Sequence, residues 1–125
     1  MKADKYYGKI LACRESQILL EALRLDIFSH LDSPITLEEL TAKTKFNQRN
    51  LEFFLKGLLS CNYIQKQNSK YFNTMEGKIF LSKNSERYIG EALIFREKMG
   101  RIEIKNRIVA YYADVDEYRK YHPHF

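Results

Sequence analysis

Few side chains in this 125-residue sequence have the types and spacing that catalysis requires. It contains no G-x-G-x-x-G run, no phosphate-binding lysine loop and no G-x-S-x-G turn. Of its three histidines, His30 falls near the end of a predicted helix, and His122 and His124 flank a proline in the C-terminal tail. Cys13 and Cys61 fall in apolar helical segments and are expected to be small buried hydrophobic residues. We therefore predict no catalytic, cofactor-binding or metal-binding residue in this chain, and whether it belongs to an enzyme stays open.

Basic residues could act differently, by contacting phosphate groups. Residues 43–107 carry 14 basic and 6 acidic side chains, whereas the whole chain has a net charge of +5. If the second predicted helix of this region reads DNA, its polar face and the following hairpin would make the contacts. The candidate DNA contacts are Arg49, Lys56, Lys66 and Lys70. However, Phe53 falls at the centre of the same helical face, and a large apolar residue there favours a protein contact, so nucleic acid is the second choice of partner.

The elements that would position these residues begin with a long helix. Apolar residues recur at spacings of three and four up to residue 31, with Leu20, Leu23 and Ile27 in one stripe. The apolar band is wider than that of a surface helix, so we expect cover on two sides. Pro34 biases its neighbour away from helical geometry, and we expect the helix to end at residues 32–34.

Two short, capped helices should follow. Thr36 and Glu39 have the spacing of a capping box, which predicts a helix to about residue 45. Asn47 is a favourable N-cap for the next helix, whose core face carries leucines and Phe54. Residues 63–67 and 70–73 flank the polar pair Asn68-Ser69 and predict a β-hairpin. Thr74 then predicts a further N-cap and a short helix to residue 81.

The C-terminal third has two apolar series with helical spacing, one from Tyr88 to Ile102 and one from Ile104 to Tyr118. They are out of phase near Gly100, which is consistent with two helices or one kinked helix. The chain is 14% aromatic, and many of its tyrosines fall on these flanking helices, as is typical of an oligomer surface. The predicted dimer interface comprises Leu19, Leu23, Ile27, Tyr88, Phe95, Met99, Ile108 and Tyr111.

This order of elements predicts a mainly α fold: a winged helix-turn-helix with a small β-hairpin wing and flanking dimerisation helices. We expect a winged-helix domain with its N-terminal helix over residues 1–84 and a C-terminal helical extension over residues 85–125. No apolar run approaches 18 residues, so no membrane span or membrane partner is predicted. Two cysteines are too few for a disulfide framework and favour a cytoplasmic location.

Several segments also resemble a known family. Residues 21–31 (EALRLDIFSHL), 35–44 (ITLEELTAKT) and 50–59 (NLEFFLKGLL) resemble, in order, helices of the N-terminal dimerisation domain of S-adenosylmethionine-dependent O-methyltransferases. Residues 71–74 (YFNT) look like the family's wing ending, and residues 85–90 (SERYIG) look like the start of its next helix. The likeness extends over roughly residues 16–95.

The resemblance implies a role that is not catalytic by itself. In that family the winged helix binds no DNA, intertwines with a second subunit and helps to wall its substrate pocket, while a following domain binds S-adenosylmethionine. The sequence ends at Phe125, before any glycine-rich cofactor loop, so it would be either a truncated domain or a stand-alone protein. The expected partners are a second copy and, in a longer protein, a C-terminal catalytic domain. The alternative is a winged-helix transcription regulator.

Overall fold

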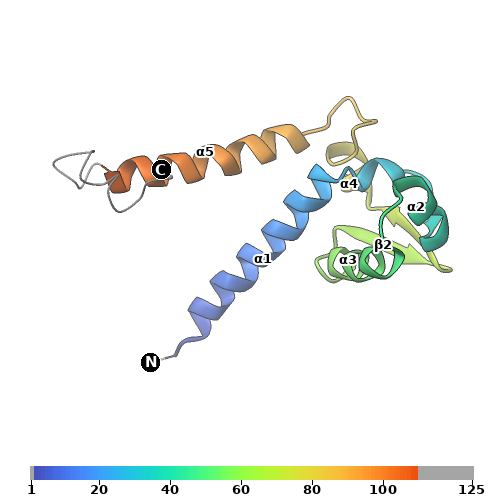
Figure 1. The fold of residues 1–125 in the computed structure, drawn as a ribbon, viewed down its shortest axis with the longest axis horizontal. Coiled ribbons are helices and arrows are strands. Elements are labelled where there is room, and N and C mark those ends of the chain that lie inside the picture. Colours follow the sequence, from blue (N-terminus) through green and yellow to red (C-terminus); the bar gives the residue numbers. More distant parts are fainter. Residues whose placement is uncertain (1, 110–125) are drawn as a thin grey trace. The chain divides into compact units, whose positions relative to one another are not determined.

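The computed structural model describes residues 2–109, with side chains as far as residue 106. The chain divides after Glu91 into two compact units, which are treated separately below. The predicted domain boundary after residue 84 stays a prediction. The elements, drawn in Figure 1, are α1 (Asp4–Arg24), the 3-10 turn η1 (Phe28–His30), β1 (Ile35–Thr36), α2 (Leu37–Thr44), α3 (Gln48–Ser60), β2 (Ile64–Gln67), β3 (Lys70–Asn73), α4 (Met75–Phe80) and α5 (Gly90–Val109).

The fold is mainly helical with one small antiparallel sheet, which confirms the predicted class at that level. The strand order is β1-β3-β2. In the register, Tyr71 of β3 pairs with Ile35 on one side and Lys66 on the other. Strand β1 was not predicted, since two residues are too few to produce an alternating pattern.

The first helix ends earlier than its apolar pattern predicts. Asp26 adopts a left-handed conformation with φ 54°. The Asp26 N–H donates to the Leu23 carbonyl, and the Ile27 N–H donates to the Ala22 carbonyl. This is the hydrogen-bond arrangement of a Schellman cap, which ends α1 at Arg24. The expected helix to residue 31 is therefore wrong, because an aspartate fills the left-handed position where glycine would have marked the end.

The predicted caps are confirmed by side-chain hydrogen bonds. Thr36 Oγ1 accepts from the Glu39 N–H at 3.1 Å, and Asn47 Oδ1 accepts from the Asn50 N–H at 3.0 Å. Thr74 Oγ1 accepts from the N–H of Gly77 at 2.9 Å. Each bond satisfies a backbone donor that the first turn of a helix leaves unpaired, so α2, α3 and α4 begin where the sequence predicts.

The hairpin is confirmed as well. Asn68 and Ser69 both have positive φ, 53° and 62°, as the two central residues of a type I′ turn require. This turn matches the natural twist of two paired strands and fixes their register. The Lys66 ammonium lies 5.0 Å from the centre of the Tyr71 ring, on the neighbouring strand.

The core of residues 1–91 lies where the end of α1, η1, α2, α3 and the sheet meet. Its fully buried side chains include those of Phe28, Ile27, Leu31, Leu40, Leu55 and Leu58. Helices α1 and α3 approach closely here, because a Cβ placed on Gly57 would lie 3.6 Å from Ile18 Cδ1. The Tyr63 hydroxyl also donates to the Glu15 carbonyl at 3.3 Å, which links α1 to the segment after α3.

The chain after α4 differs from prediction at Tyr88, and of the two alternatives given for the helical region around Gly100 it has the single helix. Tyr88 lies in an irregular segment, because Ser85 Oγ donates to the Ile79 carbonyl and the Ile89 N–H donates to the Phe80 carbonyl, so the backbone turns there. Helix α5 starts at Gly90 and runs through Gly100 without a break. The part of the second apolar series after residue 109 lies outside the described residues.

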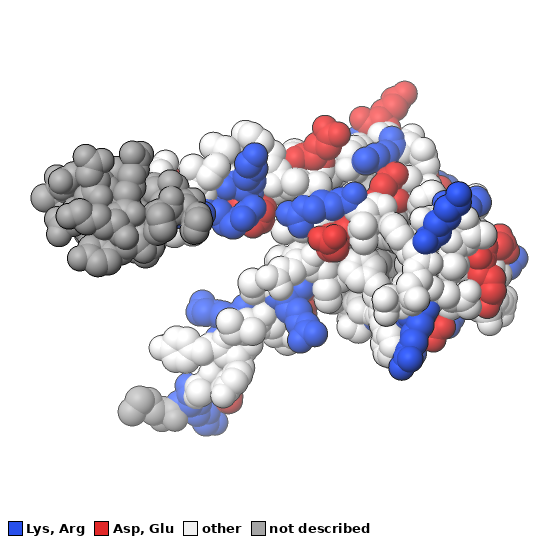
Figure 2. Space-filling view, in the orientation of Figure 1, with Lys and Arg blue, Asp and Glu red and all other residues white. Residues whose placement is uncertain are grey.

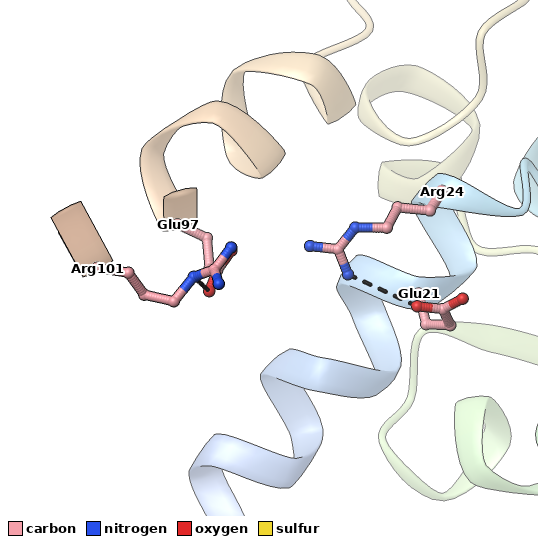
Figure 3. A network of polar contacts seen from close by, with 4 residues as sticks. All are labelled: Glu21, Arg24, Glu97 and Arg101. Carbon is pink, nitrogen blue, oxygen red and sulfur yellow. Dashed lines mark ion pairs between the residues drawn. The ribbon is translucent and has the colours of Figure 1, made fainter. Parts of the chain in front are cut away.

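Ion pairs between residues three or four positions apart lie on the surfaces of the helices. Arg24 lies 3.6 Å from Glu21 within α1, and Arg101 Nε lies 2.7 Å from Glu97 within α5 (Figure 3). Pairs at these i,i+3 and i,i+4 spacings stabilise a helix by only about 0.2–0.5 kcal/mol each. They therefore support the helices locally, and the packed core holds the fold together.

Candidate protein-interaction surface

The N-terminal half of α1 carries large apolar side chains in solvent. Tyr6, Tyr7, Ile10 and Leu11 are 60%, 74%, 70% and 59% exposed. At 100° per residue these four positions fall on one side of the helix. We call them the α1 apolar face. In Figure 2 this half of α1 shows mainly uncharged atoms, with Lys and Arg beside them. Contiguous exposed apolar surface of this kind marks a contact site.

A groove between α1 and α3 adjoins this face. Its volume is about 620 Å³. Helix α1 contributes Leu11, Arg14 and Ile18, and the α3 side contributes residues that include Phe53 and Phe54. Phe53 is 60% exposed, as expected for the apolar residue predicted on the outer face of its helix. Since Leu11 belongs to both features, the α1 apolar face and the α1–α3 groove form one continuous surface.

The structure places the predicted interface residues in different surroundings. Leu23 and Ile27 are only 2% and 0% exposed, so this chain's own core already covers them and leaves almost nothing for a partner. Leu19 and Tyr88 are half-buried. The interface role of the set as a whole stays a prediction.

The remaining members of the set lie on or beyond α5. Phe95 and Met99 are 60% and 43% exposed. Ile108 belongs to α5, in the last turn, where only the backbone is described. Tyr111 lies outside the described residues. The α5 members that the structure describes are therefore available for a contact.

The predicted DNA contacts are all exposed, on α3 and on the hairpin. Arg49 and Lys56 lie on α3, and Lys66 and Lys70 lie on β2 and β3. The Lys56 ammonium lies 3.6 Å from Glu52 and 5.4 Å from the centre of the Phe53 ring. The Lys56 ammonium therefore already interacts with two side chains of its own helix.

The sequence interpretation missed a polar cluster around Asp32. Its carboxylate accepts hydrogen bonds from Asn73, Ser82 and Asn84, each at 2.8–2.9 Å. Burial raises the pKa of Asp32, but these three donors, with the charge of Lys78, outweigh it and hold the pKa below its ordinary value of 3.8. Because the partners lie 41 to 52 residues away, local spacing could not reveal them.

The Asp32 cluster connects elements that are distant in the sequence. Asn73 Nδ2 also donates to the Phe28 carbonyl, and Asn84 Nδ2 to the Ser29 carbonyl. The Asp32 cluster therefore joins η1 to the end of β3 and to the segment after α4. Within the described residues, no group of three His, Cys, Asp or Glu side chains could hold a metal ion.

Tyr88 shows why α5 begins with glycine. A Cβ on Gly90 would fall onto the Tyr88 side chain, so only glycine leaves room for the ring in its present place. Burial, followed by the charges of Asp26 and Glu91, raises the pKa of the Tyr88 hydroxyl.

In residues 2–109 no helix is both long and apolar enough to cross a bilayer.

Comparison with known proteins gives structural relatives alone. No protein family model matches the sequence, and no curated protein matches it. Among solved structures, an O-methyltransferase family protein from Burkholderia thailandensis superposes with a TM-score of 0.70 at 18% identity, over 87% of this chain and 32% of its own. LaPhzM gives a TM-score of 0.69 at 19% identity, over 97% and 40%. Human N-acetylserotonin methyltransferase in complex with SAM gives 0.58 at 20% identity, over 81% and 31%.

These likenesses define the class of fold. The chain has the fold of a part of these methyltransferases, and it spans about a third of the length of the structures that it matches. The expected resemblance is thereby supported at the level of fold.

Proposed function

We propose that this chain is the non-catalytic N-terminal domain of an S-adenosylmethionine-dependent O-methyltransferase-like protein. The observation that carries the proposal is the fold shared with several methyltransferases over about a third of their length. In this proposal α2, α3 and the β2–β3 hairpin form a winged helix-turn-helix that pairs two copies and walls the substrate pocket of a following domain. The cofactor would be held by that following domain, so no residue of this chain is assigned to it.

The exposed apolar surface supports the pairing part of the proposal. A monomer would leave the α1 apolar face and Phe53 in water, whereas a second copy would cover them. Cys13 is exposed and Cys61 is half-buried, so the expectation that both are buried is wrong. Both are free thiols, which is in keeping with the cytoplasmic location that we propose.

Two experiments test these parts separately. Light scattering of the 125-residue chain at micromolar concentration should give twice its mass of 14.9 kDa. A mass near 14.9 kDa would contradict pairing. Sequencing the gene beyond codon 125 should then reveal a strand followed by a G-x-G-x-G loop, and calorimetry should detect S-adenosylmethionine binding only in the longer product. A stop codon at that position would contradict the methyltransferase part.

The alternative, a DNA-binding regulator, has its own test. The exposure of Arg49, Lys56, Lys66 and Lys70 is the observation in its favour. Fluorescence anisotropy with mixed-sequence duplexes should show no binding under our proposal, even at low salt. Salt-dependent binding that is lost in the double variant Arg49→Ala/Lys56→Ala would favour the regulator instead.

A further inference from the structure

We propose that residues 82–89, the segment between α4 and α5 in Figure 1, open as one unit while the core stays folded, and so release the start of α5. We call these residues the strap. The inference concerns the compact unit of residues 1–91 alone. It goes beyond the proposed function, because it holds whether or not the chain pairs or belongs to a methyltransferase.

Polar contacts with two residues hold the near end of the strap. Ser82 Oγ and Asn84 Nδ2 both donate to Asp32 Oδ2 at 2.8 Å. Asn84 Nδ2 also donates to the Ser29 carbonyl at 3.1 Å, and the Lys83 N–H donates to Ser29 Oγ at 3.0 Å. The attachment is thus concentrated on Ser29, in η1, and on Asp32 directly after it.

Little apolar burial supports these hydrogen bonds. Ser82 is fully buried, but Ile89 is 40% exposed and Tyr88 is only half-buried. Burial of apolar area is the main term that opposes unfolding, whereas a hydrogen bond that is exchanged for one with water contributes little net free energy. The strap therefore needs less free energy to open than the core, where Phe28 and Leu31 are 0% exposed.

Ser85 connects the two ends of the strap. Its N–H donates to the Ser82 carbonyl at 3.1 Å, and its carbonyl accepts from the Tyr88 N–H at 3.3 Å. Its Oγ donates to the Ile79 carbonyl at 2.6 Å. Because one residue bonds to both halves of the strap and to α4, the contacts at the two ends form and break together.

The far end of the strap meets the start of α5. The Ile89 N–H donates to the Phe80 carbonyl at 2.8 Å. The Tyr88 side chain occupies the space that a Cβ on Gly90 would take, so the strap packs against the first residue of α5. Opening the strap therefore frees the start of this helix.

Asp32 keeps a donor on the core side when the strap opens. Asn73 Nδ2, from β3, donates to Asp32 Oδ1 at 2.9 Å and to the Phe28 carbonyl at 2.8 Å. The bonds from Asn84 lie at an exposed position, where water can replace them. Opening thus leaves the carboxylate hydrogen-bonded, and the core can stay folded without the strap.

Hydrogen exchange of single amides in the full 125-residue chain tests the inference. The Lys83 and Ile89 amides bond at opposite ends of the strap, and the Leu55 amide, in α3, reports on the core. After correction for intrinsic rates, Lys83 and Ile89 should share one opening free energy that is lower than that of Leu55. Their exchange should depend on urea less steeply than that of Leu55, because opening the strap exposes less surface. An equally steep dependence at all three amides would mean that the strap opens only with the core and would overturn the inference.

The variant Asn84→Ala tests whether the strap is one unit. It removes two hydrogen bonds from an exposed position, so the chain should still fold. Exchange at Lys83 and at Ile89 should become faster by the same factor, about tenfold, as for a lost hydrogen bond to a charged group. Glu86→Gln, at an exposed position of the strap, is the control and should change neither rate. Faster exchange at Lys83 alone would show that the two ends open separately, and unchanged exchange at both would show that Asn84 does not hold the strap. Either result overturns the inference.

Discussion

Helix α1 has two halves that share an apolar pattern and differ in what covers them. In residues 18–24 the pattern is used by this chain's own core, where Ala22 and Leu23 are 0% and 2% exposed. In residues 4–17 every position is exposed, although Ile10 and Leu11 are as apolar as the core residues and Tyr6 and Tyr7 have large apolar rings. The difference teaches that an apolar stripe in the sequence predicts burial without identifying what buries it, and the exposed half is where the proposed pairing would act.

The largest effect is expected in the covered half. Leu23→Ala should lower the free energy of unfolding by about 2–5 kcal/mol, because the side chain is fully enclosed and its loss leaves a cavity. A denaturant melt followed by circular dichroism measures this. The matched control is Leu11→Ala in the exposed half, which should change the unfolding free energy of the monomer by less than about 0.5 kcal/mol. Equal losses at the two positions would erase the distinction between the halves.

The next effect concerns association instead of folding. Ile10→Asp should raise the dissociation constant of the dimer by roughly 30-fold or more, since it would put a charge at the centre of the paired α1 apolar face. Sedimentation velocity over a concentration series measures this change. Ala12→Asp introduces the same charge at an exposed position on the opposite side of the helix, so it is the control and should have a much smaller effect. If both variants dimerise like the unmodified chain, the exposed half of α1 has no part in pairing.

The next prediction concerns the Asp32 cluster and how the free energy of unfolding depends on pH. Asp32→Asn should cost about 1–2 kcal/mol, because three donors converge on the carboxylate and an amide offers only one oxygen to them. The folded pKa is lowered, so the stabilisation by Asp32 is present above about pH 3.8 and is lost as the pH falls through the lower folded value.

Melts between pH 3 and pH 7 check both statements. The stability of the unmodified chain should decline at the acid end of this range, and Asp32→Asn should reduce that decline. Glu86→Gln, at an exposed position in the same segment as Asn84, is the control and should leave the pH profile unchanged. If Asp32→Asn has the same pH profile as the unmodified chain, the charge of Asp32 does not stabilise the fold.

Local chemistry explains which parts of this molecule the sequence could predict. The caps at Thr36, Asn47 and Thr74 and the Asn68-Ser69 turn depend on residues within three positions of one another, so spacing alone located them. The end of α1 was missed because Asp26, and not glycine, adopts the left-handed conformation there.

The site was harder to predict for a different reason. Leu23 and Phe53 both belong to regular helical patterns, yet one is enclosed and the other is 60% exposed. Only tertiary packing, such as that of α1 against α3, separates them, and that packing joins residues far apart in the sequence. The Asp32 cluster is hidden for the same reason, since its donors come from β3 and from the segment after α4.

The smallest predicted effect asks what keeps the free half of α1 helical. No heavy atom beyond the chain's neighbouring backbone lies within 4 Å of a Cβ placed on Gly8, so Gly8→Ala meets no obstacle and should gain about 0.5–1 kcal/mol of helix stability. Gly8 lies away from the α1 apolar face, so the variant should leave the dimer contacts untouched. With few tertiary contacts besides the Tyr63–Glu15 hydrogen bond, this half depends largely on intrinsic helix propensity in the monomer, and the rise in helical circular dichroism should be larger in dilute monomer than in dimer. An equal rise in both states would mean that pairing does not stabilise the helix in residues 4–17.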